Sequence, residues 1–244
     1  MRHGSLLTLS LLLCACTFRA PRGIPVRVSG SIRADVHVQT RATVDVAVVP
    51  LQGAPVAEFF GIPLADAREV LFVLDVSGSM SETTTGQLAS IPPPSTDTHA
   101  QPHVPTRIEV AQAELIDAIA KLPPGSRANI LIFSDLVDAY APAEVVLDET
   151  SRADMIAFVR DMRPETATAL QPAMRVAFLM NAPRIVLLSD GLGNVGGGPE
   201  DIVRDVREAM RGGVRIDTIG IGPSQDTKLL ASLASETGGL YQRF

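Results

Sequence analysis

The sequence predicts an α/β fold, in which a doubly wound, mostly parallel sheet is flanked by helices and preceded by a β extension. From residue 69 onward, apolar strand-like runs alternate with amphipathic helical runs, which is the element order of a doubly wound sheet. Residues 70–74 and 185–188 are apolar without alternation, as expected of parallel strands that are covered on both faces. Before residue 69 the pattern changes to alternating apolar and polar residues, which favours half-buried β structure.

The first fifteen residues have the layout of a secretory signal peptide. An apolar run at residues 6–13 follows Arg2, and it is too short to span a bilayer, since a spanning helix needs about 20 apolar residues. The run ends in the letters LCAC, residues 13–16, which resemble a bacterial lipobox. Cys16 follows a small residue, so we expect it to be the lipidated cysteine. An ordinary signal peptide that is cleaved nearby is the alternative.

Lipidation at Cys16 predicts a protein of the bacterial cell envelope, with residues 16–68 as a tether and β extension. Both cysteines of the chain lie in the signal region, so the mature chain has no disulfide and no cysteine-based metal site or nucleophile. Thr17 rather than an aspartate follows Cys16, which by resemblance to proteobacterial sorting rules favours the outer membrane. We expect the lipid anchor to be the chain's one membrane contact.

Residues 26–48 alternate strictly between apolar and polar side chains. One unbroken strand of this length would be unusual, so a hairpin is expected, with its turn near residues 29–31 or near Thr40.

The composition excludes a nucleic-acid partner, because the net charge is −6 and the chain has no Trp.

The predicted domain covers residues 69–244. Its expected strands are residues 70–74, 128–133, 144–147, 184–188, 214–219 and 240–244, and its expected helices are residues 107–121, 151–162, 170–180, 199–211 and 226–237. Residues 82–105 are rich in Thr, Ser and Pro, which predicts a long functional or mobile loop. His99 and His103 lie in that loop, either as a metal site or as solvated loop residues.

Two acidic motifs follow two of the predicted strands. Asp75, Ser77 and Ser79 come directly after residues 70–74, and Asp190 follows residues 184–188. Ligands of doubly wound sheets bind at the carboxyl ends of the strands, so these side chains are expected to converge. Carboxylate and hydroxyl oxygens suit Mg²⁺ first, with Mn²⁺ or Ca²⁺ as alternatives, rather than Zn²⁺. The competing interpretation is that the first motif only caps a helix.

These motifs resemble the metal-ion-dependent adhesion site of von Willebrand factor type A domains. The pattern Asp75-x-Ser77-x-Ser79 is similar to the first motif of that family, and Ser189-Asp190-Gly191 is similar to the third. The second motif supplies a threonine, for which Thr168 fits the following residues better than Thr166. The usual Gly-Gly before that threonine is absent, which leaves the conformation of this loop open.

The resemblance implies a role for each residue. Ser77 and Ser79 would bind the cation directly, Asp75 and Asp190 through water, and Thr168 in either way. One coordination position would remain for an acidic side chain of a protein partner. The expected function is therefore a metal-dependent protein-binding or adhesion module, with exposed site residues. A structural envelope lipoprotein whose metal only stabilises the loops is the alternative.

An enzyme is not expected. A metal-dependent hydrolase of the haloacid-dehalogenase type needs an aspartate two residues after Asp75, where this chain has Ser77, and a hydroxyl is no general acid at neutral pH.

In von Willebrand factor type A domains that switch affinity, a helix after the last strand moves. This sequence shows no such helix after residue 240. The apolar residues 59–64 are a candidate to fill the corresponding groove.

Overall fold

The computed structural model describes residues 18–19, 25–26, 56–91, 103–191, 193 and 195–244. The chain divides into two compact units, Met1–Leu51 and Gln52–Phe244. In the first unit, β1 (Phe18–Arg19) and β2 (Pro25–Val26) pair antiparallel. The predicted signal peptide, Cys16, most of the alternating segment and His99 lie outside the described residues, so the predictions for them stay predictions.

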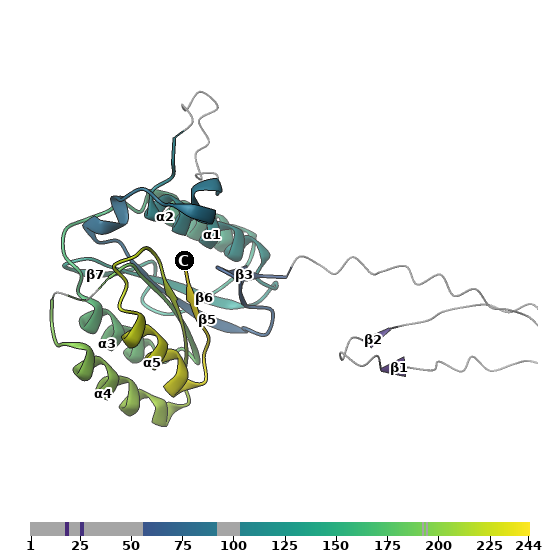
Figure 1. The fold of residues 1–244 in the computed structure, drawn as a ribbon. Helices are drawn as coiled ribbons and strands as arrows, with labels where there is room; N and C mark the ends of the chain where they lie inside the picture. Colours follow the sequence, from purple (N-terminus) through teal and green to yellow (C-terminus); the bar gives the residue numbers. More distant parts are fainter. Residues whose placement is uncertain (1–17, 20–24, 27–55, 92–102, 192, 194) are drawn as a thin grey trace, which may run out of the picture. The chain divides into compact units, whose positions relative to one another are not determined.

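A seven-stranded sheet forms the centre of the second unit (Figure 1). Its strands are β5 (Glu69–Asp75), β6 (Arg127–Phe133), β7 (Val137–Ala139), β8 (Val145–Val146), β9 (Arg184–Ser189), β10 (Arg215–Gly220) and β11 (Tyr241–Arg243). The strand order is β11-β10-β9-β5-β6-β7, and β8 also pairs with β6. The first five strands of this order run parallel, whereas β7 and β8 run antiparallel to β6. The predicted fold class is confirmed.

Five α-helices cover the two faces of the sheet (Figure 1). They are α1 (Arg107–Lys121), α2 (Glu149–Asp161), α3 (Leu170–Met180), α4 (Pro199–Ala209) and α5 (Thr227–Thr237). The first helix begins where Thr106 accepts a bond from the Glu109 amide while the Glu109 carboxylate accepts one from the Thr106 amide, a capping box that satisfies the free donors of the first turn. The bounds of α1 and α3 are those predicted, and the other three helices differ at their ends by one or two residues.

The sequence missed several short elements. The 3₁₀ helix η1 (Gly78–Ser81) lies in the first acidic motif, η2 (Gly86–Ser90) lies in the predicted loop, and η3 (Met210–Gly212) ends the α4 region. The edge strand β7 was also missed, and the strand expected at residues 144–147 is shorter. Elements of two to five residues have too few side chains to show a period.

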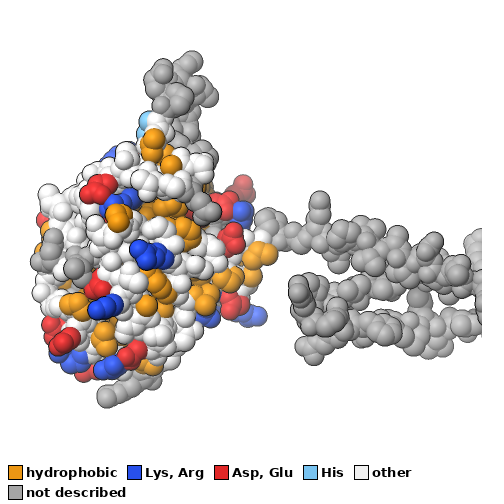
Figure 2. All heavy atoms as spheres, viewed as in Figure 1, with side chains coloured by type: hydrophobic (Ala, Val, Ile, Leu, Met, Phe, Trp, Pro, Cys, Tyr) orange, Lys and Arg blue, Asp and Glu red, His pale blue; other side chains and the backbone are white. Residues whose placement is uncertain are grey.

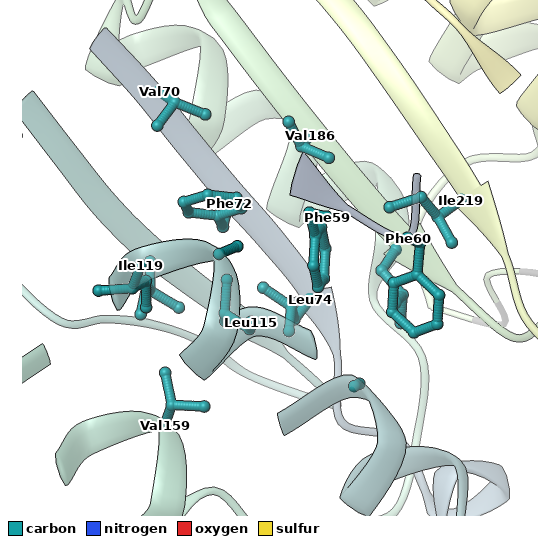
Figure 3. Close-up of a cluster of buried hydrophobic side chains, with 14 of the residues drawn as sticks. Phe59, Phe60, Val70, Phe72, Leu74, Leu115, Ile119, Val159, Val186 and Ile219 are labelled. Carbon is teal, nitrogen blue, oxygen red and sulfur yellow. The ribbon is translucent and has the colours of Figure 1, made fainter. Parts of the chain in front are cut away.

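The hydrophobic core has two layers because alternate residues of the parallel strands point to opposite faces of the sheet. Val70, Phe72 and Leu74 of β5 pack with α1 and α2, whereas Leu71 and Val73 pack with α3, α4 and α5. Figure 3 shows part of the first layer. The expectation of strands covered on both faces is confirmed, and it explains why the central strands are apolar throughout.

A short hairpin before residue 69 completes the first core layer. Its strands are β3 (Glu58–Phe59) and β4 (Ile62–Pro63). Phe59 is fully buried and its ring lies 5.6 Å from that of Phe72 (Figure 3). The Phe60 ring lies 5.1 Å from that of Phe244. The apolar segment 59–64 is therefore part of the core, in contact with α1. Within the described part of the chain, no helix has the length and apolar character needed to cross a membrane.

Candidate functional site

The carboxyl ends of β5 and β9 bring the two acidic motifs together. The two strands are parallel neighbours, with Leu74 opposite Leu188, so Asp75 and Asp190 emerge at the same edge of the sheet. The chain continues from β5 to β6 on one side and later reaches β9 on the other. This is the switch point at which doubly wound sheets bind ligands.

Hydrogen bonds connect Asp75, Ser77, Ser79 and Asp190. Asp75 Oδ1 accepts a bond of 2.9 Å from the Ser77 amide, which fixes the turn after β5. The hydroxyl oxygens of Ser77 and Ser79 are 3.2 Å apart, and Ser79 Oγ donates to Asp190 Oδ1 at 2.8 Å. Ser77 precedes η1, but its side chain makes no capping bond. The four residues therefore lie together at this edge of the sheet, and the helix-capping interpretation does not describe Ser77. Their role as metal ligands stays a prediction.

Thr168 lies in the neighbouring loop between α2 and α3. Two backbone bonds join this loop to the first motif, from the Glu165 amide to the Val76 carbonyl at 2.7 Å and from the Gly78 amide to the Thr166 carbonyl at 3.3 Å. A Cβ at Gly78 would lie 3.0 Å from the Glu165 carbonyl oxygen, so glycine allows this close approach. Thr168 is 6% exposed whereas Thr166 is exposed, and the choice of Thr168 as the ligand stays a prediction.

Asp75 has an unusual electrostatic environment. Burial raises its pKa from 3.8 to about 6, and the charge of Asp190 adds to the rise. Hydrogen bonds from Ser77 and Ser189 oppose this rise, since hydrogen bonds to a carboxylate favour its charged form. The site therefore holds two close carboxylates in a poorly solvated place, where an additional cation would be stabilising.

Arg107, the first residue of α1, is the charged partner of Asp190. Its Nη1 donates to Asp190 Oδ2 at 2.8 Å and to the Ser79 carbonyl at 3.3 Å, and its Nη2 donates to Glu82 Oε2 at 2.6 Å. Arg107 is 4% exposed. Gly222 has φ +82°, and a Cβ there would lie 2.7 Å from the Arg107 guanidinium carbon, so glycine makes room for the arginine.

The site is less accessible than the sequence predicted. Asp75, Ser77, Thr168 and Asp190 are buried, and Ser79 is half-buried, so the expectation of exposed site residues was wrong. The reason is that the loops after β5 and β9 fold over the edge of the sheet and bond to one another. Substitutions here act on packing as well as on binding.

The arrangement fits a hard divalent cation. The described residues contain no group of three or more His, Cys, Asp or Glu placed to hold a metal, so a metal site here must draw on hydroxyls as well as on the two carboxylates. Ser77, Ser79 and Asp190 already place three oxygens in hydrogen-bonding succession. An oxygen-only set with two carboxylates is the kind that Mg²⁺ accepts.

Several polar residues around the site were not expected from the sequence. Ser189 Oγ donates to Asp75 Oδ2 at 2.8 Å, and Ser134, at the end of β6, donates to the carboxylates of Asp135 and Glu165. Ser189 belongs to a motif that was recognised for its aspartate alone.

His103 is half-exposed, with its ring nitrogen 3.0 Å from a carboxylate oxygen of Glu109, so its described neighbour is a capping residue of α1.

Comparison with known proteins places the fold. A model of the von Willebrand factor type A domain matches residues 70–192, about half of the chain. The structure resembles von Willebrand factor type A from Catenulispora acidiphila, with a TM-score of 0.57 and 20% identity over 72% of this chain and 38% of the other. It also resembles an aerotolerance-related membrane protein from Bacteroides fragilis, with a TM-score of 0.52 and 18% identity over 72% of this chain and 90% of the other.

Sequence relatives cover the same region. Inter-alpha-trypsin inhibitor heavy chain H3 of Rattus norvegicus is 25% identical over 197 residues, which are 75% of this chain and 20% of the relative. Heavy chain H4 of Homo sapiens is 25% identical over 190 residues, which are 72% of this chain and 18% of the relative. This chain therefore spans about a fifth of the length of the curated relatives that it matches.

Proposed function

Because this chain belongs to the von Willebrand factor type A domain family, we propose that it is a metal-dependent protein-binding module of the cell envelope. Domains of this family are typically adhesion or protein-binding modules. The proposal of metal dependence rests on the contact between the loops that follow β5 and β9. There, Ser79 Oγ bonds to Asp190 Oδ1 beside the hydroxyl of Ser77.

The proposed ligands follow from this geometry. Ser77 and Ser79 supply hydroxyl oxygens, Asp75 and Asp190 supply negative charge, and Thr168 adds a hydroxyl from the neighbouring loop. Bound there, Mg²⁺ would supply a positive centre with a position free for an acidic side chain of the partner. Mn²⁺ or Ca²⁺ suits the same oxygen set.

Attachment to the envelope through a lipid on Cys16 belongs to the same proposal. Its test is mass spectrometry of the mature N-terminus, together with the Cys16→Ser variant. We expect the wild type to carry lipid on Cys16 and the variant to leave the membrane fraction. An unmodified mature N-terminus at another residue would contradict lipid anchoring. The proposed binding site would be unaffected by that result.

A binding module rather than an enzyme is proposed for two reasons. Ser77 stands where a haloacid-dehalogenase-type phosphatase needs its acid, and the one described histidine, His103, belongs to the start of α1. Purified protein should not hydrolyse aryl phosphates, esters or peptides in Mg²⁺ or Mn²⁺. Metal-dependent turnover that is lost in Asp75→Asn would contradict this assignment.

The direct test of function is capture of a partner from the envelope fraction of the producing cell. We expect a protein that is retained in Mg²⁺, released by chelator and not captured by Asp190→Ala. Asp154→Ala is the matched control, because Asp154 is exposed on α2. Mg²⁺ that protects the protein against heat but retains no partner would favour the structural alternative.

A further inference from the structure

A pocket of about 400 Å³ adjoins the candidate metal site. It lies between the segment around η2 and the carboxyl ends of β10 and β11. Its walls include Thr85, Leu88, Arg107, Ile221, Arg243 and Phe244. A volume of this size is within the range of pockets that bind small ligands or single side chains.

Arg107 joins the pocket to the metal site. Arg107 lines the pocket and its guanidinium lies next to Gly222 of the pocket wall, while Nη1 bonds to Asp190 Oδ2 at 2.8 Å. The guanidinium is held in place by Glu82 on one side and by the Ser79 carbonyl on the other. Because one planar group borders both, the pocket is the immediate neighbour of the proposed metal ligands.

The lining of the pocket combines apolar side chains with two arginines, three threonines and Glu82, whose carboxylate pairs with Arg107. Leu88, Ile221 and Phe244 supply apolar surface, and Phe244 is still 37% exposed. Arg243 is exposed and makes no ion pair with any of the described residues. On the face that Figure 2 shows, basic, acidic and apolar side chains lie among one another.

We propose that this pocket is a second subsite of the same binding surface, and that it takes an apolar, preferably aromatic, side chain next to the metal-binding acid of a partner peptide. The inference rests on the proposed metal-dependent function. An extended peptide advances about 3.3–3.6 Å per residue. With the peptide's acidic side chain on the metal, a residue one or two positions away can therefore pass the Arg107 guanidinium and reach the pocket. The free charge of Arg243 complements an acidic segment, which favours a peptide over an uncharged ligand.

The experiment uses full-length protein, Mg²⁺ and five capped peptides. The parent peptide is Gly-Ser-Ser-Asp-Ser-Ser-Gly, and in each of the other four one serine is replaced by phenylalanine. Affinities are measured by ligand-observed NMR titration, with and without chelator. In the wild type, we expect at least one phenylalanine position to raise the affinity about tenfold over the parent, since burying an aromatic side chain is strongly favourable.

A pocket-filling variant locates the effect. Thr85 is exposed at the pocket rim and makes no capping bond to η2, so Thr85→Tyr should fill the pocket without disturbing the fold. We expect the affinity ratio of the best phenylalanine peptide to the parent to fall to about one. Thr150→Tyr, at an exposed position of α2, is the control and should keep the ratio.

The outcomes separate this inference from the function on which it rests. Metal-dependent binding with no gain at any phenylalanine position would overturn the subsite and leave the proposed function standing. A gain that survives in Thr85→Tyr would place the aromatic side chain elsewhere and also overturn the subsite. No metal-dependent binding of any peptide would overturn the proposed function, and the subsite with it.

Discussion

The two ends of strand β9 carry the same kind of ion pair in different surroundings. At its first residue, Arg184 donates to Asp217 at 2.7 Å, and just past its last residue, Asp190 accepts from Arg107 at 2.8 Å. All four side chains are buried. The pairs differ in what else their polar atoms contact, and that difference separates a structural pair from a functional one.

We call the pair at the start of β9 closed, because neighbouring protein groups bond to both of its side chains. Arg184 also bonds to Asp66 and to the Pro63 carbonyl, so it fixes the β3–β4 hairpin to the sheet. Asp217 Oδ1 accepts further bonds from Arg215 and from the Leu240 amide. The partners of this pair include the Pro63 carbonyl and the Leu240 amide, so the pair holds elements of the fold together.

The pair after β9 is open by comparison. Asp190 Oδ1 faces the Ser79 hydroxyl, which a cation could replace as a partner, and Arg107 borders a pocket. Burial raises the pKa of the nearby Asp75, and the charge of Asp190 adds to the rise. A buried charge cluster that is short of positive charge and lies next to a pocket is suited to binding.

The largest effect on stability is expected at the closed pair. Arg184→Met should lower the free energy of unfolding by about 3–5 kcal/mol, because breaking a buried ion pair leaves a charge without compensation. Urea unfolding measures the loss, and calorimetry should give an unchanged Mg²⁺ affinity. A loss below about 1 kcal/mol, or a fall in Mg²⁺ affinity, would show that the two ends of β9 are not separate in role.

The next largest effect is expected at Asp75, where a substitution should raise the free energy of unfolding instead of lowering it. With a folded-state pKa raised from 3.8 to about 6, the folded protein binds more protons than the unfolded chain between these values. Its free energy of unfolding should therefore fall as pH rises through this window, by up to about 3 kcal/mol in total. Without metal, Asp75→Asn should restore part of this stability at pH 8 and little at pH 4.

The control for that measurement is Asp154→Asn, on the exposed face of α2, which should leave the pH profile unchanged. Mg²⁺ affinity of the wild type should rise from pH 5 to pH 7, since the metal competes with the proton. A metal-free Asp75→Asn variant that is less stable than the wild type at pH 8 would contradict the assignment of the raised pKa.

A matched pair of threonines tests the second loop. Thr168→Ala should weaken Mg²⁺ binding about tenfold, which corresponds to the loss of one oxygen ligand worth about 1.4 kcal/mol. Thr166→Ala should leave it unchanged, because Thr166 is exposed and contributes its backbone carbonyl to Gly78. Equal effects in calorimetry would show that the threonine was assigned wrongly.

The smallest effect is expected at Arg107. Replacing it in Arg107→Gln removes a positive charge next to the proposed cation, so Mg²⁺ affinity should rise about fivefold. Arg243→Gln, at the exposed rim of the pocket, is the control for a change in net charge. Weaker Mg²⁺ binding in Arg107→Gln would mean that the arginine organises Asp190 for the metal rather than competing with it.

Sequence patterns predicted the parts of this comparison that depend on local order. The apolar runs of β5 and β9 located Asp75 and Asp190 at strand ends, and helical periodicity located α1 and α3 to the residue. Arg107 and Arg184 were missed as partners, because each pairs with a residue that is distant in sequence and no local pattern encodes the contact. The burial of the site was also missed, since it depends on how three loops pack on one another.

The most direct test of the account is calorimetric titration of Mg²⁺ and Mn²⁺ into the wild type and Asp190→Ala, with Asp154→Ala as control. We expect one bound ion per chain in the wild type and in the control, and no binding in Asp190→Ala at millimolar metal. Indistinguishable titrations of the wild type and Asp190→Ala would contradict the metal site and the function proposed from it.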